Sequence, residues 1–321
     1  MAHSTIFTYL GILFSLGIVA ATIDFILPYL RPSRLHRYLH RGDSAQTSWA
    51  LVTGASDGIG KALCYELAAT GFNVVLHGRN PSKLEAVQNS LSSTFPSRAF
   101  RTIVADATIC TEDAIQAIAN RVSDLQLTVV INNAGGTPVS APNGDIYKRL
   151  DEYSHKEVAD TVNMNVVFPT MLSNALLPLM IRNGGRGVII MIGSVAARGF
   201  PLIAPYGAGK AYLRVLSEAL GQEMHMAGYD VEVICMPLGG VTGVQAIWQK
   251  PSLFTPHATT AAKKILARVG CGRSEIMPHW PHALQRLLTD LIPRGLRGGI
   301  FREAMAEIQR NGLNPQDGKR D

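Results

Sequence analysis

The glycine-rich stretch from Thr53 to Gly60, TGASDGIG, is the feature that most constrains what this chain can fold into. It follows the apolar run 49–52 and precedes a helix-forming segment, so it lies where a buried strand gives way to a helix. Glycine accepts positive φ and has no Cβ, so backbone N–H groups in such a turn can approach a phosphate at the positive end of a helix. We therefore expect Gly54, Gly58 and Gly60 to cradle the pyrophosphate of a dinucleotide. The spacing GxxxGxG departs from the general GxGxxG fingerprint, and an ordinary tight turn would carry similar glycines.

Short runs rich in β-branched residues follow this turn and alternate with segments long enough for helices. These runs are 74–76, 103–105, 127–131, 188–192 and 231–235. Such alternation indicates a parallel sheet with helices on both faces. With 47% hydrophobic and 17% charged residues, the chain can bury a sizeable core. We expect a single α/β domain of the doubly wound, Rossmann type over 46–310, followed by a polar tail over 311–321.

The amino-terminal segment reads as a membrane anchor. Residues 4–23 contain no Asp, Glu, Lys or Arg, and about twenty apolar residues suffice for one bilayer crossing. We expect an anchor over 1–30 that contacts the membrane through residues 4–30, then a basic juxtamembrane linker over 31–45. Lys and Arg accumulate on the cytoplasmic side, so the linker and domain should face the cytosol.

Two alternatives to a single crossing stay open. A cleaved signal peptide is one, although the leader before the apolar run has no Lys or Arg. A hairpin that does not fully cross is the other, because Asp24 and Pro28 lie near the end of the segment.

Composition and charge limit the kinds of partner that this protein is expected to bind. The net charge of +6 is modest, and the densest basic run, from Arg31 to Arg41, lies beside the apolar segment, which favours a membrane over nucleic acid. The four cysteines form no CxxC pair and no metal-ligand spacing, so we expect no metal site and a reduced compartment.

The end of the second strand bears on cofactor choice. An NAD site places a carboxylate about twenty residues after the first glycines, whereas Gly78 stands there in this chain and Arg79 follows it. Because a guanidinium pairs with a 2′-phosphate, we expect NADPH/NADP⁺. A solvated turn residue is the alternative for Arg79.

Two further strand ends carry polar residues. Asp106 ends the third strand, where it could accept a hydrogen bond from an adenine amino group or cap the following turn. The small polar cluster Asn132–Gly135 ends the fourth strand and could bring the backbone close to a cofactor, although alone it would be only a turn.

A reactive pair follows the fifth strand. Tyr206 and Lys210 are four residues apart, so on a helix they share one face. A neighbouring ammonium lowers the pKa of a phenol, which makes tyrosine a useful proton donor near neutral pH. A lone YxxxK is more often a surface pair, but here Ser194 ends a strand twelve residues earlier.

Together these motifs resemble the short-chain dehydrogenase/reductase family, over the chain from about Trp49 to Thr242. The resemblance implies a catalytic tetrad of Asn165, Ser194, Tyr206 and Lys210. In it, Tyr206 would donate a proton, Ser194 would orient the substrate carbonyl, and Lys210 would hold the nicotinamide ribose and lower the pKa of Tyr206. Asn165 would hold a water that links Lys210 to bulk solvent. The implied cofactor contacts are Gly54, Ser56, Gly58, Ile59, Gly60, Arg79, Asp106, Asn133, Tyr206, Lys210, Val241 and Thr242.

Two positions depart from the family pattern. The usual Pro-Gly pair after the sixth strand is replaced by the sequence PLGGVT over 237–242, which leaves the nicotinamide contact in question. Asn163 competes with Asn165 for the helix position, although the residues after Asn165 match the family better.

The apolar amino terminus, the residues 77–79 and the segment 277–284 resemble one branch of this family, which contains very-long-chain 3-oxoacyl-CoA reductases and membrane-bound 17β-hydroxysteroid dehydrogenases. Reductases of fungal secondary metabolism and of 3-ketodihydrosphingosine share these features. The resemblance implies NADPH-dependent reduction of a ketone to a secondary alcohol on a lipophilic substrate, whether 3-oxoacyl, steroid-like, or a polyketide or terpenoid secondary metabolite. It also implies the endoplasmic reticulum membrane and a possible homodimer.

Two other functions remain as alternatives: NAD-dependent alcohol oxidation, and a non-catalytic, membrane-tethered nucleotide-binding scaffold. At the substrate end, we expect the apolar segment 243–256 to be a lid or a simple connection. The leucines 284, 287, 288 and 291 share one helical face. That face would pack on the domain or lie on the membrane surface.

Overall fold

A computed structural model of the chain describes residues 2–39, 48–137, 147–244 and 250–310. The expected polar tail over 311–321 therefore lies outside the described residues, as do residues 40–45 of the expected linker, 46–47 at the start of the expected domain and 245–249 of the expected lid.

The centre of the molecule is one sheet of six parallel strands in the order β3-β2-β1-β4-β5-β6. The strands are β1 (Trp49–Thr53), β2 (Asn73–Gly78), β3 (Phe100–Val104), β4 (Leu127–Asn132), β5 (Arg186–Ser194) and β6 (Asp230–Leu238). The chain first builds outward from β1 to β3 and then restarts beside β1 with β4, so the direction of winding reverses between β1 and β4. This reversal confirms the predicted doubly wound sheet, and ligands in such sheets bind at the carboxyl ends of the strands beside the reversal.

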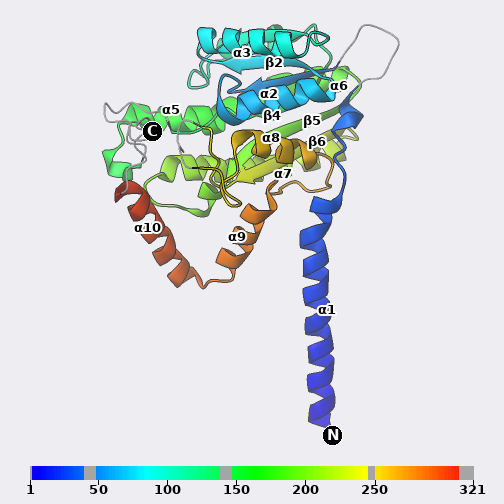
Figure 1. Cartoon of the computed structure of the whole chain (residues 1–321), viewed down its shortest axis with the longest axis vertical. Helices are drawn as coiled ribbons and strands as arrows, with labels where there is room; N and C mark the ends of the chain where they lie inside the picture. The colour runs from blue at the N-terminus through cyan, green and yellow to red at the C-terminus, as the bar shows by residue number, and fades with distance from the viewer. Residues whose placement is uncertain (1, 40–47, 138–146, 245–249, 311–321) are drawn as a thin grey trace.

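Helices cover both faces of the sheet (Figure 1). Successive strand residues alternate between the faces: Val52 and Val129 lie in one buried cluster, and Leu51 and Val130 lie in the other. The first face carries α2 (Gly58–Thr70), α3 (Pro81–Thr94) and α8 (Ala258–Ala267). The second face carries α4 (Glu112–Asn120), α6 (Phe168–Arg182) and α7 (Ala204–Met226). The alternation explains why the strands are apolar throughout, since both faces are buried.

Shorter elements connect these layers. They are η1 (Leu35–Tyr38), η2 (Leu150–Glu152), α5 (His155–Val162), the π-helical turn η3 (Asn163–Val167) and η4 (Val195–Arg198). Several helices begin at a side-chain cap that the sequence specifies. The Asn80 side chain accepts from the Lys83 N–H ahead of Pro81, and Ser154 forms a capping box with Glu157.

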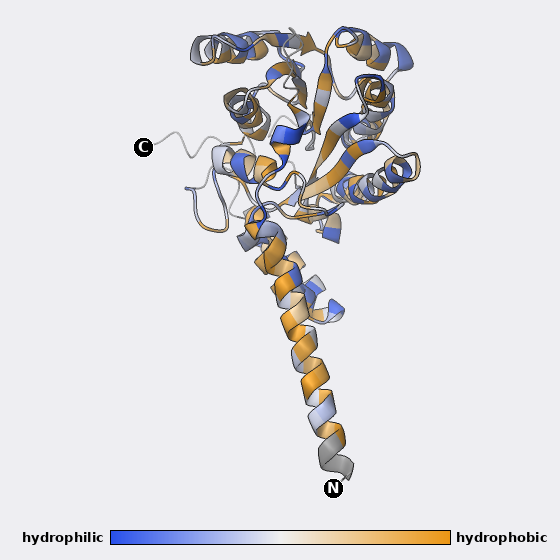
Figure 2. Ribbon diagram, turned by 90° about the vertical axis from the view of Figure 1, so that its right-hand side faces the viewer, coloured by the Kyte–Doolittle hydropathy of each residue, from blue (hydrophilic) through white to orange (hydrophobic). Residues whose placement is uncertain are grey.

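Helix α1 (Ala2–Leu30) projects away from the domain along the long axis of the molecule, and it is apolar over most of its length (Figures 1 and 2). The side chains from Ile6 to Asp24 are exposed, and Ile6–Leu30 is long and apolar enough to cross a bilayer. The stretch His155–Arg182 passes the same test of length and composition, but nearly half of it is buried. That stretch contains α6, which packs under the sheet as a core helix.

The carboxyl end of α1 is fastened to the domain by hydrogen bonds. The Tyr29 hydroxyl donates to the Met277 carbonyl at 2.8 Å, and Arg268 donates to the Pro28 carbonyl at 2.5 Å. One turn further on, the Ser33 hydroxyl donates to the Leu266 carbonyl at 2.6 Å.

The first part of the expected linker is built into the domain. Leu35 and Tyr38 are buried in the cluster beneath α8. The Tyr38 hydroxyl donates to Glu232 at 2.9 Å, and the same carboxylate accepts from the Gly270 N–H at 3.0 Å. The structured unit therefore begins well before residue 46.

Helices α9 (Trp280–Asp290) and α10 (Arg294–Arg310) form a bent pair at the end of the described chain. The bend between them extends from the side of the domain that also carries α1 (Figure 1).

Candidate active site

The turn after β1 has the shape predicted for a phosphate cradle. Gly54 and Gly58 have φ of 67° and 54°, a region that favours glycine. Gly60 has ordinary φ, but a Cβ there would lie 2.1 Å from the Gly54 carbonyl oxygen, so only glycine lets α2 approach β1 this closely. Asp57 caps α2 by accepting from the Gly58 N–H at 2.7 Å. The turn can therefore present its backbone N–H groups to an anion.

The carboxyl ends of β1 and β4 are tied together at the point of reversal. Asn133 Nδ2 donates to the Thr53 carbonyl at 2.9 Å. The Thr53 hydroxyl accepts from the Asn133 and Ala134 N–H groups, both at 2.9 Å. Asn133 thus fixes the glycine turn. The sequence did not indicate that Thr53 is the residue with which Asn133 forms these hydrogen bonds.

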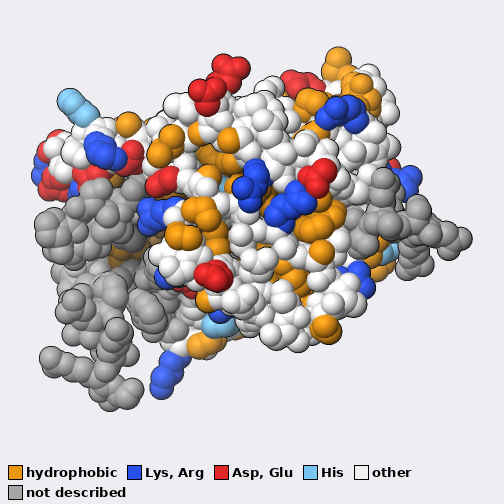
Figure 3. Space-filling model, turned by 90° about the horizontal axis from the view of Figure 1, so that it is seen from above, with side chains coloured by type: hydrophobic (Ala, Val, Ile, Leu, Met, Phe, Trp, Pro, Cys, Tyr) orange, Lys and Arg blue, Asp and Glu red, His pale blue; other side chains and the backbone are white. Residues whose placement is uncertain are grey.

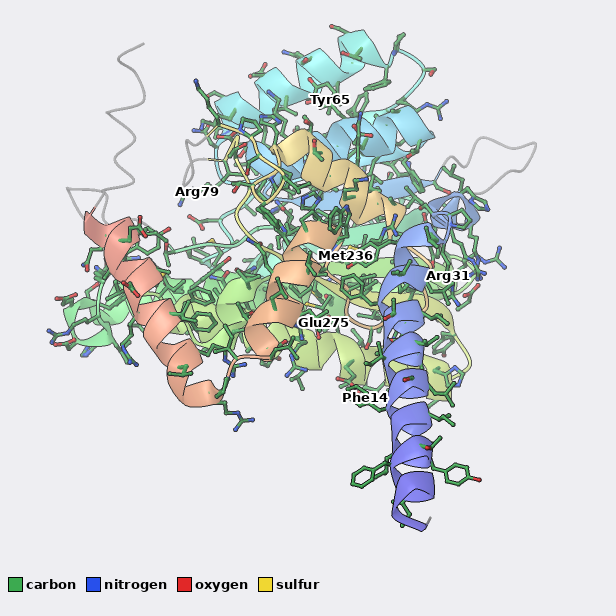
Figure 4. All side chains as sticks on the ribbon, turned by 60° about the horizontal axis from the view of Figure 1, so that its bottom comes forward. Phe14, Arg31, Tyr65, Arg79, Met236 and Glu275 are labelled. Carbon is green, nitrogen blue, oxygen red and sulfur yellow. The ribbon has the colours of Figure 1, made fainter. Side chains whose placement is uncertain are left out.

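The end of β2 leaves room beside the turn. A Cβ on Gly78 would lie 3.6 Å from the Ser56 hydroxyl, so a side chain at position 78 would point toward the cradle. Arg79 is exposed at the edge of the domain far from α1 (Figure 4), and it forms no ion pair with any residue that the structure describes. Its guanidinium is therefore available to an anionic ligand. Ile59 packs partly against the core under α2.

Asp106 caps the turn after β3, as the alternative interpretation held. Its Oδ1 accepts from the Thr108 N–H and from the Thr108 hydroxyl, both at 2.9 Å. A contact with adenine stays a prediction. Asn163 is tied to the same turn, since its Nδ2 donates to the Thr108 carbonyl at 3.0 Å.

The segment after β6 holds the last expected cofactor contacts. Val241 and Thr242 are buried, and the Thr242 backbone pairs with the carbonyl of Pro256 and the N–H of Ala258. Within the described part of the chain the Thr242 hydroxyl is buried without a hydrogen-bond partner. Such an orphaned group fits a position that a bound cofactor would satisfy.

Ser194, Tyr206 and Lys210 meet where β5 ends and α7 begins. The Ser194 hydroxyl accepts from the Ala196 N–H at 3.1 Å, which fixes the start of η4. Lys210 is buried, and its Nζ donates to the Ile192 carbonyl at 2.9 Å.

Asn165, and not Asn163, lies at this site. It is fully buried in the π-helical turn η3, a type of irregularity common at functional sites. Its Nδ2 donates to the carbonyls of Thr161 and Gly136 at 2.8 and 2.7 Å, and its Oδ1 accepts from the Gly136 N–H at 3.1 Å. The side chain therefore fixes the loop after β4.

Gly135 is the place where Asn165 and Lys210 come together. A Cβ on Gly135 would lie 2.7 Å from Lys210 Nζ and 2.9 Å from Asn165 Oδ1. The absence of a side chain there allows the amide and the ammonium to flank the same loop. The structure thus brings Asn165, Ser194, Tyr206 and Lys210 to one end of the sheet.

The electrostatics of the pair differ from the expectation. Burial raises the pKa of Tyr206, while the hydrogen bond with Ser194 acts in the opposite direction. Lys210 Nζ lies 5.6 Å from the centre of the Tyr206 ring. Burial lowers the pKa of Lys210 to about 8, because a dry site disfavours the ammonium.

Two histidines that the sequence reasoning did not assign support the loop after β6. His282 Nδ1 accepts from the Gly239 N–H at 3.1 Å, and its Nε2 donates to the Phe254 carbonyl at 3.0 Å. A Cβ on Gly239 would lie 2.9 Å from this ring, so the first glycine of the sequence PLGGVT accommodates His282. His279 bonds the Leu253 carbonyl at 2.7 Å. In the sequence, the only indication that His279 and His282 matter was the resemblance of the segment 277–284 to one branch of the family.

A doubly wound sheet with a glycine cradle at its reversal and a Ser-Tyr-Lys cluster at its carboxyl edge defines a dinucleotide-dependent oxidoreductase. Comparison with known proteins identifies the family. The short chain dehydrogenase model matches residues 48–250, more than half of the chain, and this protein belongs to that family.

Curated relatives match a larger share of the chain than the family model does. A very-long-chain 3-oxoacyl-CoA reductase-like protein of Arabidopsis thaliana is 35% identical over 273 residues, which cover 83% of this chain and 81% of the relative. A very-long-chain 3-oxoacyl-CoA reductase of Coprinopsis cinerea is 32% identical over 291 residues, covering 88% and 82%.

Solved structures share the fold. A 7β-hydroxysteroid dehydrogenase structure superposes with a TM-score of 0.69 at 18% identity, covering 83% of this chain and 98% of that one. A metagenomic short-chain oxidoreductase in complex with NADP superposes with a TM-score of 0.57 at 26% identity, covering 72% and 96%.

Proposed function

We propose that this protein is an NADPH-dependent reductase that converts a ketone on a lipophilic substrate to a secondary alcohol. The observation that carries the proposal is that Ser194, Tyr206 and the buried Lys210 lie together where β5 ends and α7 begins. A proton donor, a group that polarises a carbonyl and a cation thus lie together at the edge where this fold binds its ligands.

The residues at the cradle fit the dinucleotide. Gly54, Gly58 and Gly60 carry no side chain at three positions of the turn, and the orphaned Thr242 hydroxyl offers a further polar contact. Arg79 is the candidate for the 2′-phosphate, and a relative of 26% identity is known in complex with NADP. When bound, NADPH supplies the hydride that the carbonyl carbon accepts.

The chain's own groups handle the oxygen and its proton. The Ser194 hydroxyl donates a hydrogen bond to the substrate carbonyl and polarises it, and Tyr206 delivers its proton to the same oxygen. Because the pKa of Lys210 is about 8, its ammonium is mostly protonated at neutral pH and can stabilise the phenolate that remains. Asn165 holds the loop beside Lys210 in place, and we assign it the water that resupplies the proton.

A very-long-chain 3-oxoacyl thioester is the substrate class we favour. Relatives of 35% and 32% identity carry that activity in their names. The apolar helix α1 would anchor the protein in the membrane where such chains reside, and we assign it to the endoplasmic reticulum with the domain in the cytosol. A homodimer is compatible with this arrangement.

The test uses the purified full-length protein with NADPH and a panel of 3-oxoacyl-CoAs of increasing chain length, steroid ketones and polyketide ketones. At least one class should be reduced, and Tyr206→Phe should lower kcat by at least about 100-fold while NADPH binding persists. Retained activity in that variant would contradict the mechanism. NADPH binding without turnover of any substrate would favour a non-catalytic, membrane-tethered nucleotide-binding scaffold. Faster alcohol oxidation with NAD⁺ would favour an NAD-dependent alcohol oxidase.

A further inference from the structure

We propose that the bend between α9 and α10 is a second membrane contact, lying in the near surface of the bilayer that α1 crosses. The proposal rests on the proposed function, which places α1 in a membrane. It commits to a lipid surface as the occupant of this region.

Large apolar side chains gather on the bend without cover from the rest of the described chain. Leu291 is 74% exposed and Leu296 is 68% exposed. Leu287, Leu288 and Ile300 are also exposed on these two helices, and Trp280 is exposed at the start of α9. Soluble surfaces rarely leave so many large apolar groups together, and such patches mark binding surfaces. The predicted leucine face of α9 thus lies open at 287, 288 and 291.

The position of this apolar bend selects the membrane as its partner. Figure 1 shows the bend projecting from the same side of the domain as α1, at the level of the part of α1 nearest the domain. Any bilayer crossed by α1 would therefore meet the bend. The opposite face of the domain carries charged groups of both signs (Figure 3), as expected for a surface that faces water.

Near its carboxyl end, α1 changes from an uncharged segment to residues that form polar contacts with the domain. Asp24 pairs with Arg273 of the domain, whereas the segment before it has no charged residue. Phe14 projects from the free part of α1, and Arg31 lies at its base (Figure 4). The polar boundary of the membrane thus falls near Asp24.

Charges around the apolar bend suit the headgroup layer. Arg294 and Arg302 of α10 are exposed beside the apolar side chains, and Trp280 adds an aromatic ring of the kind enriched at membrane interfaces. Leucines with flanking arginines are the composition of a helix that lies in the interface.

The apolar bend contacts the segment between Ser194 and Tyr206, which we call the catalytic loop. Arg198 of η4 forms an ion pair with Asp290 at the end of α9. Two residues later, the Phe200 ring stacks on Phe301 of α10 with centroids 4.2 Å apart. Both Arg198 and Phe200 lie between Ser194 and Tyr206 in the chain. Docking the bend on lipid would therefore hold the catalytic loop near the bilayer surface, where a lipophilic ketone could enter.

The experiment places a polarity-sensitive fluorophore on the full-length protein in phosphatidylcholine vesicles containing phosphatidylserine. Because Cys110 is the one partly accessible thiol among the four buried or half-buried cysteines, the background is Cys110→Ser. Leu291→Cys carries the probe, and Glu85→Cys on the exposed side of α3 is the matched control. The probe at 291 should shift to the blue and be quenched by nitroxides on lipid acyl chains, while the probe at 85 should be quenched only by aqueous iodide.

Two results would overturn the proposal. One is quenching at 291 by iodide alone. The other is protection of 291 from both quenchers together with cross-linking between chains, which would show that a second copy covers the bend.

A second variant links the contact to turnover. Leu288→Asp combined with Leu291→Asp should lower turnover of a vesicle-borne long-chain substrate by at least about tenfold, while a short-chain, water-soluble ketone is unaffected. An equal loss for both substrates would contradict the entry role. Lipid quenching at 291 without turnover of any ketone would instead refute the proposed function and leave the membrane contact standing.

Discussion

At the residue scale, the site is organised by buried polar side chains whose partners are main-chain groups. Asn133 and Thr53 bond each other's backbone, Asn165 bonds the loop at Gly136, and Lys210 bonds the Ile192 carbonyl. Main-chain partners move little, so these side chains are held in one rotamer before substrate arrives. Such preorganisation is the usual source of electrostatic catalysis.

Arg79 should decide cofactor preference. Arg79→Ala should weaken NADPH binding by about 10- to 100-fold, because a hydrogen bond to a charged group contributes about 1.5–3 kcal/mol. NADH binding should hardly change. Fluorescence titration of both nucleotides measures this, with Arg98→Ala, which removes a guanidinium bound to the Gly71 carbonyl, as the matched control. Equal losses for NADH and NADPH would contradict the assignment.

His77 should make the fold acid-sensitive. It is buried against Phe168 with neither ring nitrogen paired within the described chain, and burial lowers its pKa to about 4. The unfolded chain takes up the proton near pH 6.5, so stability is complete above that pH and falls as pH drops toward 4. The loss should approach about 3 kcal/mol for this residue.

Thermal unfolding in detergent between pH 7 and pH 4 measures this effect. His77→Phe should flatten the pH dependence in part, since burial also lowers the pKa of His282 to about 4. The exposed His225→Gln should leave it unchanged. If His77→Phe kept the wild-type dependence of unfolding temperature on pH, His77 would take up a proton as readily in the folded protein as in the unfolded chain.

At the element scale, the connection from β1 to α2 requires glycine at position 60 because there is no space for a Cβ, and not because of its backbone conformation. Gly60→Ala should destabilise the fold by about 1–3 kcal/mol, because its Cβ would overlap the Gly54 carbonyl oxygen. NADPH binding should weaken as the cradle shifts. Gly221→Ala in α7 is the matched control, since its Cβ would meet Val233 at an ordinary 3.7 Å.

Calorimetry and nucleotide titration distinguish the two glycines. Gly221→Ala should be neutral or stabilising by up to about 1 kcal/mol, because alanine favours helix. Similar behaviour of the two variants would mean that the cradle can relax around a Cβ.

At the scale of the whole molecule, the domain extends back to the end of α1. A chain that starts at Pro28 should fold, because it keeps Leu35 and Tyr38. A chain that starts at Ser48, the first residue matched by the family model, should lose the burial of both side chains and leave Glu232 without the Tyr38 hydroxyl. At about 1.5–3 kcal/mol for each buried side chain, its Tm should fall by at least about 6 °C. Equal Tm values for the two chains would show that residues 28–47 are a dispensable tether.

Much of the site could be predicted because its residues occur in a fixed order at the ends of strands. The cradle from Thr53 to Gly60, Asn165, Ser194, Tyr206 and Lys210 all lie at the carboxyl edge of the sheet. The role of Gly135 could not be predicted, since it depends on two side chains from distant helices meeting at one loop. His282 was missed for the same reason, because its partners Gly239 and Phe254 are brought to it only by the fold.

The sequence alone determined the doubly wound sheet and named the candidate glycine cradle and candidate reactive groups, because periodicity and glycine placement are local properties. The tertiary structure decided which neighbours those groups meet. It buried Lys210 and thereby lowered its pKa, and it brought Tyr206 and Ser194 to the same end of the sheet. It also packed the supposed linker onto β6 and left the leucines of α9 exposed beside α1. These outcomes depend on burial and long-range contacts, which no stretch of sequence contains by itself.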